Sequence, residues 1–351
     1  MGALRGLFVR RGRRASHAAG PGPVKPECTI LVASAGRRVE LIQCFRESAA
    51  ALGIGARVIA VDLAPARSAA CQVADLALPV PRCDHPDYVP ALLGICAEHG
   101  VDLVVPTIDP ELAVLSRHAG DFRAGGTWVS VSGPATVDMA RDKLRTARLL
   151  AELGLPVPRS APVAEVLRAP QDWTWPVLVK PRSGSSSIGI RVVPSPDQLG
   201  GLEHDDDRLV QELLRGEEYT VNLFFDRAGR LRCAIPHRRL EVRGGEVAKG
   251  ITMRHPELER IAWRLGAALE GARGALCFQA IVDQAGTPMV FEINARFGGG
   301  YPLAQRAGAR FTQWLLEEAS GRPLSAGNDW EGGLLMLRYD QAVFRAGSTE
   351  R

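Results

Sequence analysis

Two short strand-like segments in the last quarter of the chain carry side chains that could bind a metal ion. Gln279 lies in the first segment, and Glu292 and Asn294 lie in the second. If a four-residue turn joins them, Asp283 pairs with Pro288, and this register places Gln279 opposite Glu292. Asn294 shares the face of Glu292, because side chains along a strand alternate between faces. One carboxylate and two amide oxygens suit a hard cation such as Mg²⁺.

The alternative interpretation is an amphipathic hairpin whose polar face is simply solvated. The polar positions interrupt strongly apolar runs at 280–282 and 289–293, which favours a sheet with little exposed face. Polar groups buried in such a sheet need partners. Asp283, nearer the turn, is a second-tier candidate ligand. The segment ends in Arg296 and in three glycines at 298–300, where backbone amides could bind an anion.

A loop rich in glycine and serine follows another strand-like segment, which ends near Lys180. Such loops expose successive backbone amides that can wrap phosphate oxygens, and the lysine can contact the same charge. The loop is not a P-loop, since it lacks Gly-Lys-Ser/Thr and leads into a strand instead of a helix. A flexible hairpin connection is the alternative. The candidate loop contacts are Ser183, Gly184, Ser185, Ser186, Ser187 and Gly189.

Residues 208–221 have the pattern of an apolar strand that is interrupted by Gln211 and Glu212. Such a strand can offer backbone groups to an adenine edge, and a nearby carboxylate can bind ribose hydroxyls. A strand that ends in an ordinary acidic turn is the alternative. The segment therefore points to a nucleotide only in combination with the other motifs.

The first part of the chain is predicted to form a different kind of sheet, which would help to position these groups. From residue 29 to about Gly133, short strand-like runs alternate with helical patterns, which predicts an open parallel sheet flanked by helices. Ligands of such sheets gather at the carboxyl ends of the strands, here residues 34–38, Asp62 and 107–111. A nicotinamide dinucleotide is disfavoured, because a Rossmann turn needs three spaced glycines and this turn has only Gly36.

The second part of the chain is separated from the first by a helix and a linker. The periodicity of residues 138–154 predicts one helix that stops at Gly154. Prolines between residues 156 and 170 mark a linker into a new unit. Paired strands with occasional helices follow, so the predicted fold is an α/β domain succeeded by an α+β domain.

The uneven distribution of charge limits the classes of molecule that we expect this protein to bind. The chain has a formal net charge of +4, but residues 1–26 hold six Lys or Arg and no acid, so the remainder is mildly acidic. This pattern argues against a polyanion binder, and no apolar stretch reaches the length of a membrane span. We therefore expect neither nucleic acid nor a membrane as partner. Residues 1–27 are expected to be a disordered basic tail. Seven unpatterned cysteines fit reduced thiols in a cytoplasmic protein.

The order and spacing of these motifs resemble the ATP-grasp superfamily. The most telling segments are Gln-Glu-Leu-Leu-x-Gly-Glu-Glu-Tyr-Thr-Val and Glu-Ile-Asn-Ala-Arg. The chain looks most like the carboxylate–amine ligase group related to the carbamoyl-phosphate synthase large subunit. This resemblance implies a pre-ATP-grasp α/β domain at 28–133 and an ATP-grasp domain of two α+β lobes at 134–345. The nucleotide-binding lobe would cover about 160–220, and the metal lobe about 221–345.

The resemblance also implies which residues contact the nucleotide. Lys143, in the helix before the linker, matches the first phosphate-binding lysine, and Lys180 matches the second. The glycine- and serine-rich loop matches a loop that closes over the phosphates. The remaining matches are the backbone of Glu212 and Leu214 for adenine, with help from Gln211, and Glu218 for ribose.

The metal ligands and the catalytic residues follow from the same resemblance. Gln279, Glu292 and Asn294 match the magnesium ligands, although many relatives place an acid where Gln279 stands. Arg296 matches an arginine that faces the transferred phosphate or the acyl phosphate. The segment 234–250 would cross the active site. Its candidate contacts are Arg238, Arg239 and Lys249, with a solvated basic hairpin as the alternative for each.

The activity implied by the resemblance is that of an ATP-dependent ligase. With Mg²⁺, or Mn²⁺ in its place, it would activate a small-molecule carboxylate as an acyl phosphate for attack by an amine. Lys180, Arg239 and Arg296 are the expected catalytic residues. The alternatives are an enzyme that phosphorylates bicarbonate or carbamate, and a non-catalytic ATP-binding regulatory module. The sequence names neither substrate and leaves a homodimer open.

Overall fold

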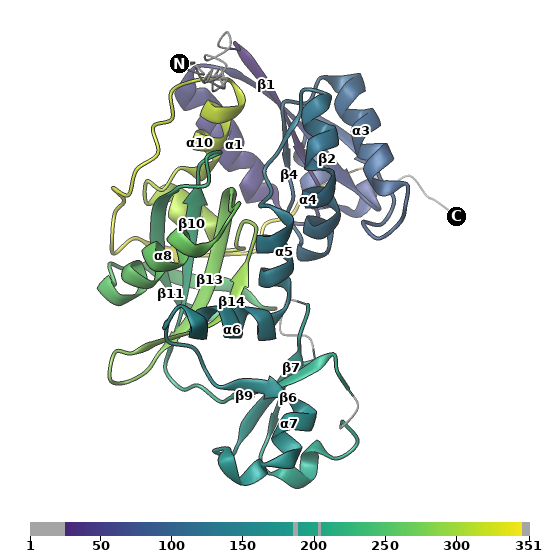
Figure 1. Ribbon diagram of the computed structural model, residues 1–351. Helices are drawn as coiled ribbons and strands as arrows, with labels where there is room; N and C mark the ends of the chain where they lie inside the picture. Colours follow the sequence, from purple (N-terminus) through teal and green to yellow (C-terminus); the bar gives the residue numbers. More distant parts are fainter. Residues whose placement is uncertain (1–24, 185–188, 203–204, 346–351) are drawn as a thin grey trace, which may run out of the picture.

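The computed structural model describes residues 25–184, 189–202 and 205–345, which form three sheets (Figure 1). The first sheet is parallel throughout, with strand order β3-β2-β1-β4-β5, as predicted. Its strands are β1 (Glu27–Val32), β2 (Gly55–Asp62), β3 (Leu76–Pro79), β4 (Leu103–Val105) and β5 (Trp128–Val129). Its helices are α1 (Val39–Leu52), α2 (Ala69–Val73), α3 (Tyr88–His99) and α4 (Asp109–Ala124), with a short 3-10 turn η1 (Pro65–Arg67).

Strand β1 lies at the centre of this parallel sheet and is buried on both faces. Leu31 packs in one apolar core with residues of α3 and α4. Ile30 and Val32 belong to a second core with residues of α1. A strand that is covered on both faces needs apolar side chains at nearly every position. The sequence of β1 therefore does not alternate between apolar and polar residues.

The helix predicted at 138–154 is two helices, α5 (Pro134–Arg141) and α6 (Lys143–Glu152). Asp142 separates them because its extended backbone leaves the helix and its carboxylate caps the next one. The carboxylate accepts from the amides of Leu144 and Arg145, and it also binds the Arg182 guanidinium at 2.6 Å. An aspartate at this position is a strong N-cap, a signal that the periodicity concealed. The break makes Lys143 the first residue of α6.

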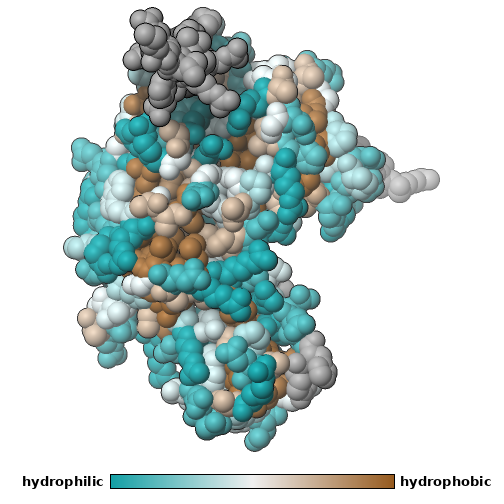
Figure 2. All heavy atoms as spheres, in the orientation of Figure 1, coloured by the Kyte–Doolittle hydropathy of each residue, from teal (hydrophilic) through white to brown (hydrophobic). Residues whose placement is uncertain are grey.

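A four-stranded antiparallel sheet of order β6-β9-β7-β8 forms a small lobe with its own apolar core. We call residues 160–212 of this unit the small lobe; it lies at the bottom of Figure 1 and projects from the rest of the molecule in Figure 2. Its strands are β6 (Ser160–Pro162), β7 (Val177–Pro181), β8 (Arg191–Val193) and β9 (Arg208–Glu212). Its helical segments are α7 (Val163–Arg168), η2 (Pro170–Asp172) and η3 (Pro196–Leu199).

The third sheet is six-stranded, with order β14-β13-β10-β11-β12-β15 and antiparallel pairing. We call it the large sheet. Its strands are β10 (Glu217–Phe225), β11 (Leu231–Arg243), β12 (Glu246–Thr252), β13 (Gly274–Val282), β14 (Pro288–Asn294) and β15 (Leu335–Leu337). The helices in this part of the chain are α8 (Pro256–Ala268), α9 (Tyr301–Arg306) and α10 (Phe311–Ala319).

The segment 208–221, expected as one interrupted strand, is divided between two sheets. β9 ends at Glu212 in the small lobe, and β10 begins at Glu217 in the large sheet. Gly216 makes the crossing possible, because a Cβ at this position would lie 2.1 Å from the carbonyl oxygen of Val282. A close backbone approach of this kind admits only glycine. The crossing places the small lobe beside one face of the large sheet.

The parallel sheet and the large sheet share their apolar cores, whereas the small lobe does not join them. One shared core includes Leu31 and Phe278, and the other includes Ile30 and Phe224. The molecule therefore consists of one large body and one separately cored lobe. Within the described residues, no helix combines the length and apolar character needed to span a bilayer.

Candidate active site

The hairpin of β13 and β14 holds the predicted metal-binding residues in an irregular register. Near the turn, Pro288 pairs with Val282 and not, as predicted, with Asp283. A bulge between Gln279 and Ala280 then shifts the pairing by one residue, so Gln279 lies opposite Glu292 as predicted. The bulge thus compensates for the one-residue difference between the predicted turn and the observed turn.

Asp283, the second-tier candidate ligand, has a different contact. Its side chain is exposed, and its Oδ1 accepts from the amides of Ala285 and Thr287, both at 2.9 Å. It caps the turn that it begins, as aspartate commonly does.

Glu292 is the carboxylate at the centre of the site. Lys143 compensates its charge, and Gln279 forms a hydrogen bond with it. Lys143 Nζ lies 3.7 Å from Glu292 Oε1 and donates to the carbonyl of Gly184 at 2.7 Å. The amide of Gln279 satisfies both of its neighbours when its nitrogen donates to Glu292 Oε2 (3.1 Å) and its oxygen accepts from Arg239 (3.0 Å). In this orientation, Gln279 positions Glu292 and directs its own oxygen away from it.

Lys180 projects from β7 of the small lobe toward the same carboxylate. Its side chain is 2% exposed, its Nζ donates to Gln211 Oε1 at 2.9 Å, and it lies 5.4 Å from the centre of the Phe291 ring. Burial lowers the pKa of Lys180 to about 8, against the opposing effect of Glu292, and Lys143 lowers it further. A buried ammonium with one neutral partner is suited to an anionic ligand.

Of the three basic candidates on the β11–β12 hairpin, only Arg239 faces this site. Arg239 binds Glu218 Oε1 at 2.7 Å and the carbonyl of Gly245 at 2.9 Å. Burial raises the pKa of Glu218, while Arg239 opposes that rise. Arg238 points to the other face of the strand and binds Glu217, and Lys249 binds Glu241 at 2.6 Å. Neither of these two lines the cavities described below.

Two cavities meet at Glu292. The first, which we call the lysine cavity, has a volume of about 300 Å³ and lies between the small lobe and the large sheet. It is lined by most of the predicted nucleotide contacts: Lys143, Lys180, Ser183, Gly184, Gln211, Glu212, Leu214 and Glu218. Gly189 is not part of its lining, and Ser185, Ser186 and Ser187 lie outside the described residues.

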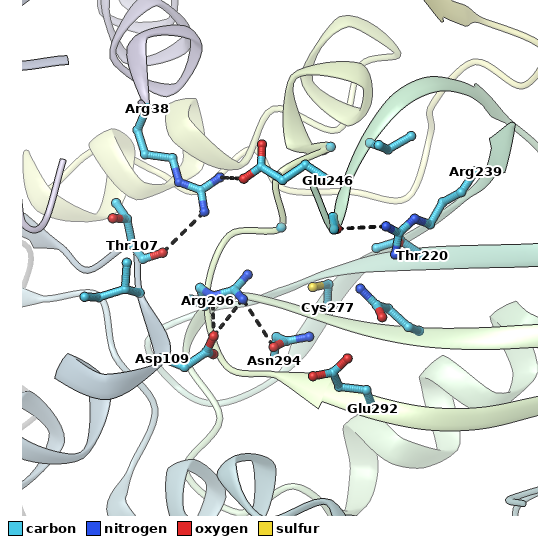
Figure 3. A pocket seen from close by; sticks show the side chains of 17 residues that line it. Arg38, Thr107, Asp109, Thr220, Arg239, Glu246, Cys277, Glu292, Asn294 and Arg296 are labelled. Carbon is cyan, nitrogen blue, oxygen red and sulfur yellow. Dashed lines mark hydrogen bonds and ion pairs between the residues drawn. The ribbon is translucent and has the colours of Figure 1, made fainter. Parts of the chain in front are cut away.

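The second cavity, which we call the Arg296 cavity, has a volume of about 150 Å³ (Figure 3). It lies between the carboxyl ends of the parallel strands and the large sheet. Four residues line both cavities, namely Arg239, Gly245, Gln279 and Glu292. Two of the metal-binding candidates, Gln279 and Glu292, therefore stand at the junction of the two cavities, and Asn294 lines the Arg296 cavity.

Arg296 is fixed by a residue from the parallel-sheet domain. Its Nε and Nη2 both bind Asp109 Oδ2, at 3.1 and 2.7 Å, and Nη2 also reaches Asn294 Oδ1 at 3.3 Å. Desolvation opposes the charge on Arg296, but Asp109, Cys277 and Glu292 together outweigh it and raise the pKa of the guanidinium. Figure 3 shows Asp109 and Asn294 on either side of this guanidinium.

A second contact between the domains closes the opposite side of the Arg296 cavity. Arg38 lies 3.4 Å from Glu246 and donates to the carbonyl of Thr107 at 3.5 Å (Figure 3). Residues 34–38 and 107–111 were expected at the ligand end of the sheet, and the structure places Arg38, Thr107 and Asp109 there. Asp62, from the same expectation, instead accepts from the amide of Gly36 at 2.8 Å.

Sequence reasoning did not single out several residues of the Arg296 cavity. Among them are Cys277 and Glu246, although the segment 234–250 that contains Glu246 was expected to cross the site. Glu246 follows the Gly244–Gly245 turn, and nothing in its surroundings along the chain distinguishes it from a solvated acid. Cys277 could have been found, because it pairs with Asn294 in the same hairpin. The glycines at 298–300 have a packing role: a Cβ on Gly299 would lie 2.8 Å from the Glu246 side chain.

Family models match both parts of the chain. A model described as the PylC-like N-terminal domain matches residues 30–130, and the ATP-grasp domain model matches residues 140–300. The chain belongs to the ATP-grasp superfamily. Both cavities described above involve residues of its ATP-grasp domain, and the Arg296 cavity also uses residues of the N-terminal domain.

Relatives of this ATP-grasp protein match only parts of it. The formate-dependent phosphoribosylglycinamide formyltransferase of Synechococcus sp. (strain RCC307) is 35% identical over 154 residues, which are 43% of this chain and 37% of that protein. The D-alanine–D-alanine ligase of Marinomonas sp. (strain MWYL1) is 27% identical over 226 residues, 55% of this chain and 69% of that protein.

Solved structures show the same fold over most of the chain. The biotin carboxylase domain of the Hydrogenobacter thermophilus 2-oxoglutarate carboxylase, determined with MgADP and bicarbonate, has a TM-score of 0.70 at 19% identity. That likeness covers 88% of this chain and 73% of the other. At this level of identity it establishes the architecture, while the chemistry must be argued from the residues.

Proposed function

We propose that the protein is an ATP- and Mg²⁺-dependent ligase that activates a small-molecule carboxylate as an acyl phosphate and joins it to an amine. One observation carries this proposal: the two cavities share Glu292, Gln279, Arg239 and Gly245. A phosphate held by the two lysines in one cavity would thus face an acid held in the other. The chemistry needs this arrangement, because the acid oxygen must reach the terminal phosphorus of the nucleotide.

The lysine cavity is suited to a nucleoside triphosphate. Lys143 and Lys180 come from opposite walls and supply positive charge for the phosphates. Glu218 is the proposed ribose contact, and backbone groups near Leu214 would meet the adenine. The amide of Glu212 already donates to the carbonyl of Arg159 at 2.9 Å, so Glu212 would contribute only its carbonyl or side chain.

The donor set at Glu292 fits a magnesium ion that is shared with substrate phosphates. Within the described residues there is no cluster of three or more His, Cys, Asp or Glu that could hold a metal alone. Glu292 and the Asn294 oxygen are hard donors, and Mg²⁺ characteristically completes its shell with water and phosphate oxygens. A bound ion would neutralise phosphate charge during transfer. Gln279 would position Glu292 and not ligate the metal, as its contact with Arg239 suggests.

The Arg296 cavity would hold the acid and the incoming amine. Arg296 would orient the carboxylate, which attacks the terminal phosphorus of ATP while ADP leaves. The amine then attacks the acyl carbon, phosphate leaves, and the nitrogen gives up a proton. Arg239, which lines both cavities, would stabilise the charge on the transferred phosphate. The chain's contribution is orientation and electrostatics, since no nucleophile of the protein is required.

Release of ADP and phosphate is the decisive measurement. The full chain, with ATP and Mg²⁺, would be screened against pairs of amino acids and other small acids and amines, comparing the native protein with Lys180→Ala. A matched control is Lys249→Ala, because Lys249 is a lysine outside both cavities. We expect release that depends on both substrates, is lost in Lys180→Ala and is kept in Lys249→Ala.

Other outcomes would distinguish the alternatives. Release that depends on bicarbonate without an amine would indicate the bicarbonate- or carbamate-phosphorylating enzyme. ATP binding without turnover over the whole panel would indicate a regulatory module. A homodimer and a cytoplasmic location remain predictions from the sequence.

A further inference from the structure

A third cavity lies at the end of the parallel sheet opposite to the Arg296 cavity. It has a volume of about 370 Å³, and we call it the Trp128 cavity. Asp102 and Trp128 reach it from the amino ends of β4 and β5, and Arg123 reaches it from the end of α4. The large sheet contributes Arg227, from the β10–β11 turn, and Arg273, which precedes β13. Both parts of the body therefore form its walls.

The three arginines gather at this cavity with few acids to compensate their charge. Among the residues that the structure describes, none of the three guanidinium groups forms a salt bridge, and Asp102 is already paired with Lys25. The first 26 residues contain no Asp or Glu that could serve as a counter-charge. Holding like charges together at a cavity costs free energy unless an anion is bound there.

Two contacts hold Arg227 and Arg273 in place. The Arg227 guanidinium stacks on the Trp128 ring at 4.0 Å from its centre, which fixes its plane. Arg273 Nε donates to the carbonyl of Arg227 at 3.0 Å, so its two terminal nitrogens remain for a ligand. A nearby acid, Glu318, accepts from the amide of Arg227 at 2.7 Å, and burial raises its pKa to about 7. Glu318 is therefore only a partial counter-charge.

We infer that the Trp128 cavity binds a phosphate-bearing small molecule, at a site separate from the ATP cleft. Planar guanidinium groups bind phosphate oxygens through paired hydrogen bonds, and three of them around one cavity favour a doubly charged group over a single carboxylate. Because the walls come from both the parallel sheet and the large sheet, the ligand would also bridge these two parts. The inference does not depend on the proposed ligase activity.

Calorimetric titration of the full chain with pyrophosphate, and separately with inorganic phosphate, tests this site at low ionic strength. Saturating Mg·ADP is present to occupy the lysine cavity, and Lys180→Ala provides a second check that the signal arises elsewhere. The test variants are Arg123→Gln and Arg227→Gln. The control is Arg168→Gln, which changes an exposed arginine of the small lobe.

We expect the native protein, Arg168→Gln and Lys180→Ala to bind pyrophosphate equally. Each test variant should bind it roughly tenfold more weakly, because a charge-assisted contact is lost. Should Arg227→Gln fail to fold, Arg123→Gln carries the test alone, since the Arg123 side chain is exposed. Equal affinity in all variants, or no uptake of either anion by the native protein, would overturn the inference.

Discussion

The two halves of the candidate active site are built on different kinds of connection. The lysine cavity lies between the large sheet and the small lobe, which has its own apolar core. The Arg296 cavity lies between two sheets that share their cores, and ion pairs from Arg296 and Arg38 reinforce that contact. Shared packing resists displacement, whereas separately cored units can move relative to each other. The proposed nucleotide half therefore joins units that can move relative to each other, whereas the proposed acid half is held by shared packing.

The largest effect that this comparison predicts is at the junction itself. Among the residues that the structure describes, Glu292 is the one carboxylate that lines both cavities, and Glu292→Gln removes its charge. We expect turnover to fall by about 10²–10³-fold, the typical cost of losing one charge-stabilising group at a reacting centre. ADP release at a series of Mg²⁺ concentrations measures this effect. Glu241→Gln, an acid outside both cavities, is the control, and equal turnover in the two variants would refute the assignment.

A smaller effect is expected from the protonation of Lys180 in the nucleotide half. The pKa of Lys180 is lowered to about 8, so the free enzyme loses this positive charge as pH rises through that value. Phosphates bind the protonated form, and ADP affinity should therefore decline above pH 8, approaching about tenfold per pH unit. Titration calorimetry between pH 7 and 9.5 would show this. Lys180→Arg should abolish the decline, and a flat profile in the native protein would contradict the assignment.

Asp109→Asn should weaken binding of the acid in the Arg296 cavity without changing nucleotide binding in the lysine cavity. Loss of the carboxylate releases Arg296 from its bidentate contact, and we expect the KM for the acid to rise about tenfold. ADP affinity should be unchanged. Asp121→Asn, an exposed position on the same helix, is the matched control. If ADP affinity fell as far as acid affinity, the two halves would not be separable.

The smallest effect is expected at the outer ion pair of the same cavity. The Glu246 side chain is 44% exposed, so solvent screens its contact with Arg38. Glu246→Gln and Arg38→Gln should each change the KM for the acid only about two- to fivefold. A double-mutant cycle measures the coupling, which should stay below about 1 kcal/mol. A larger coupling would show that this pair, and not the shared core, sets the geometry.

How much could be predicted from the sequence depended on the distance along the chain between the residues concerned. The pairing of Gln279 with Glu292 was predicted from an assumed four-residue turn within one hairpin. The turn is one residue longer than predicted, and the bulge after Gln279 restores the predicted pairing. The parallel sheet followed from the alternation of apolar runs and helical patterns. The break at Asp142 was missed because periodicity alone does not distinguish one helix from two that share a face.

Contacts between distant segments could not be predicted. The pairs Arg296–Asp109 and Arg38–Glu246 join residues 187 and 208 positions apart, and they depend on how two sheets pack. The crossing at Gly216 was likewise missed. The polar run from Arg215 to Glu218 interrupts the apolar pattern there, but it does not reveal that the strands on its two sides join different sheets. Each of these features is set by tertiary packing, which a single sequence does not encode locally.

The shared cores also determine where this protein could be recombined with a relative. The sequence suggests a domain boundary near Gly133. Joining two proteins there would remove packing partners from both apolar cores and expose the remaining core residues to water. Cuts on either side of the small lobe, near residues 158 and 215, would leave those cores intact. The small lobe, which holds Lys180, is thus the part of this chain that could be exchanged with that of a relative. The N-terminal domain and the large sheet would have to be kept together.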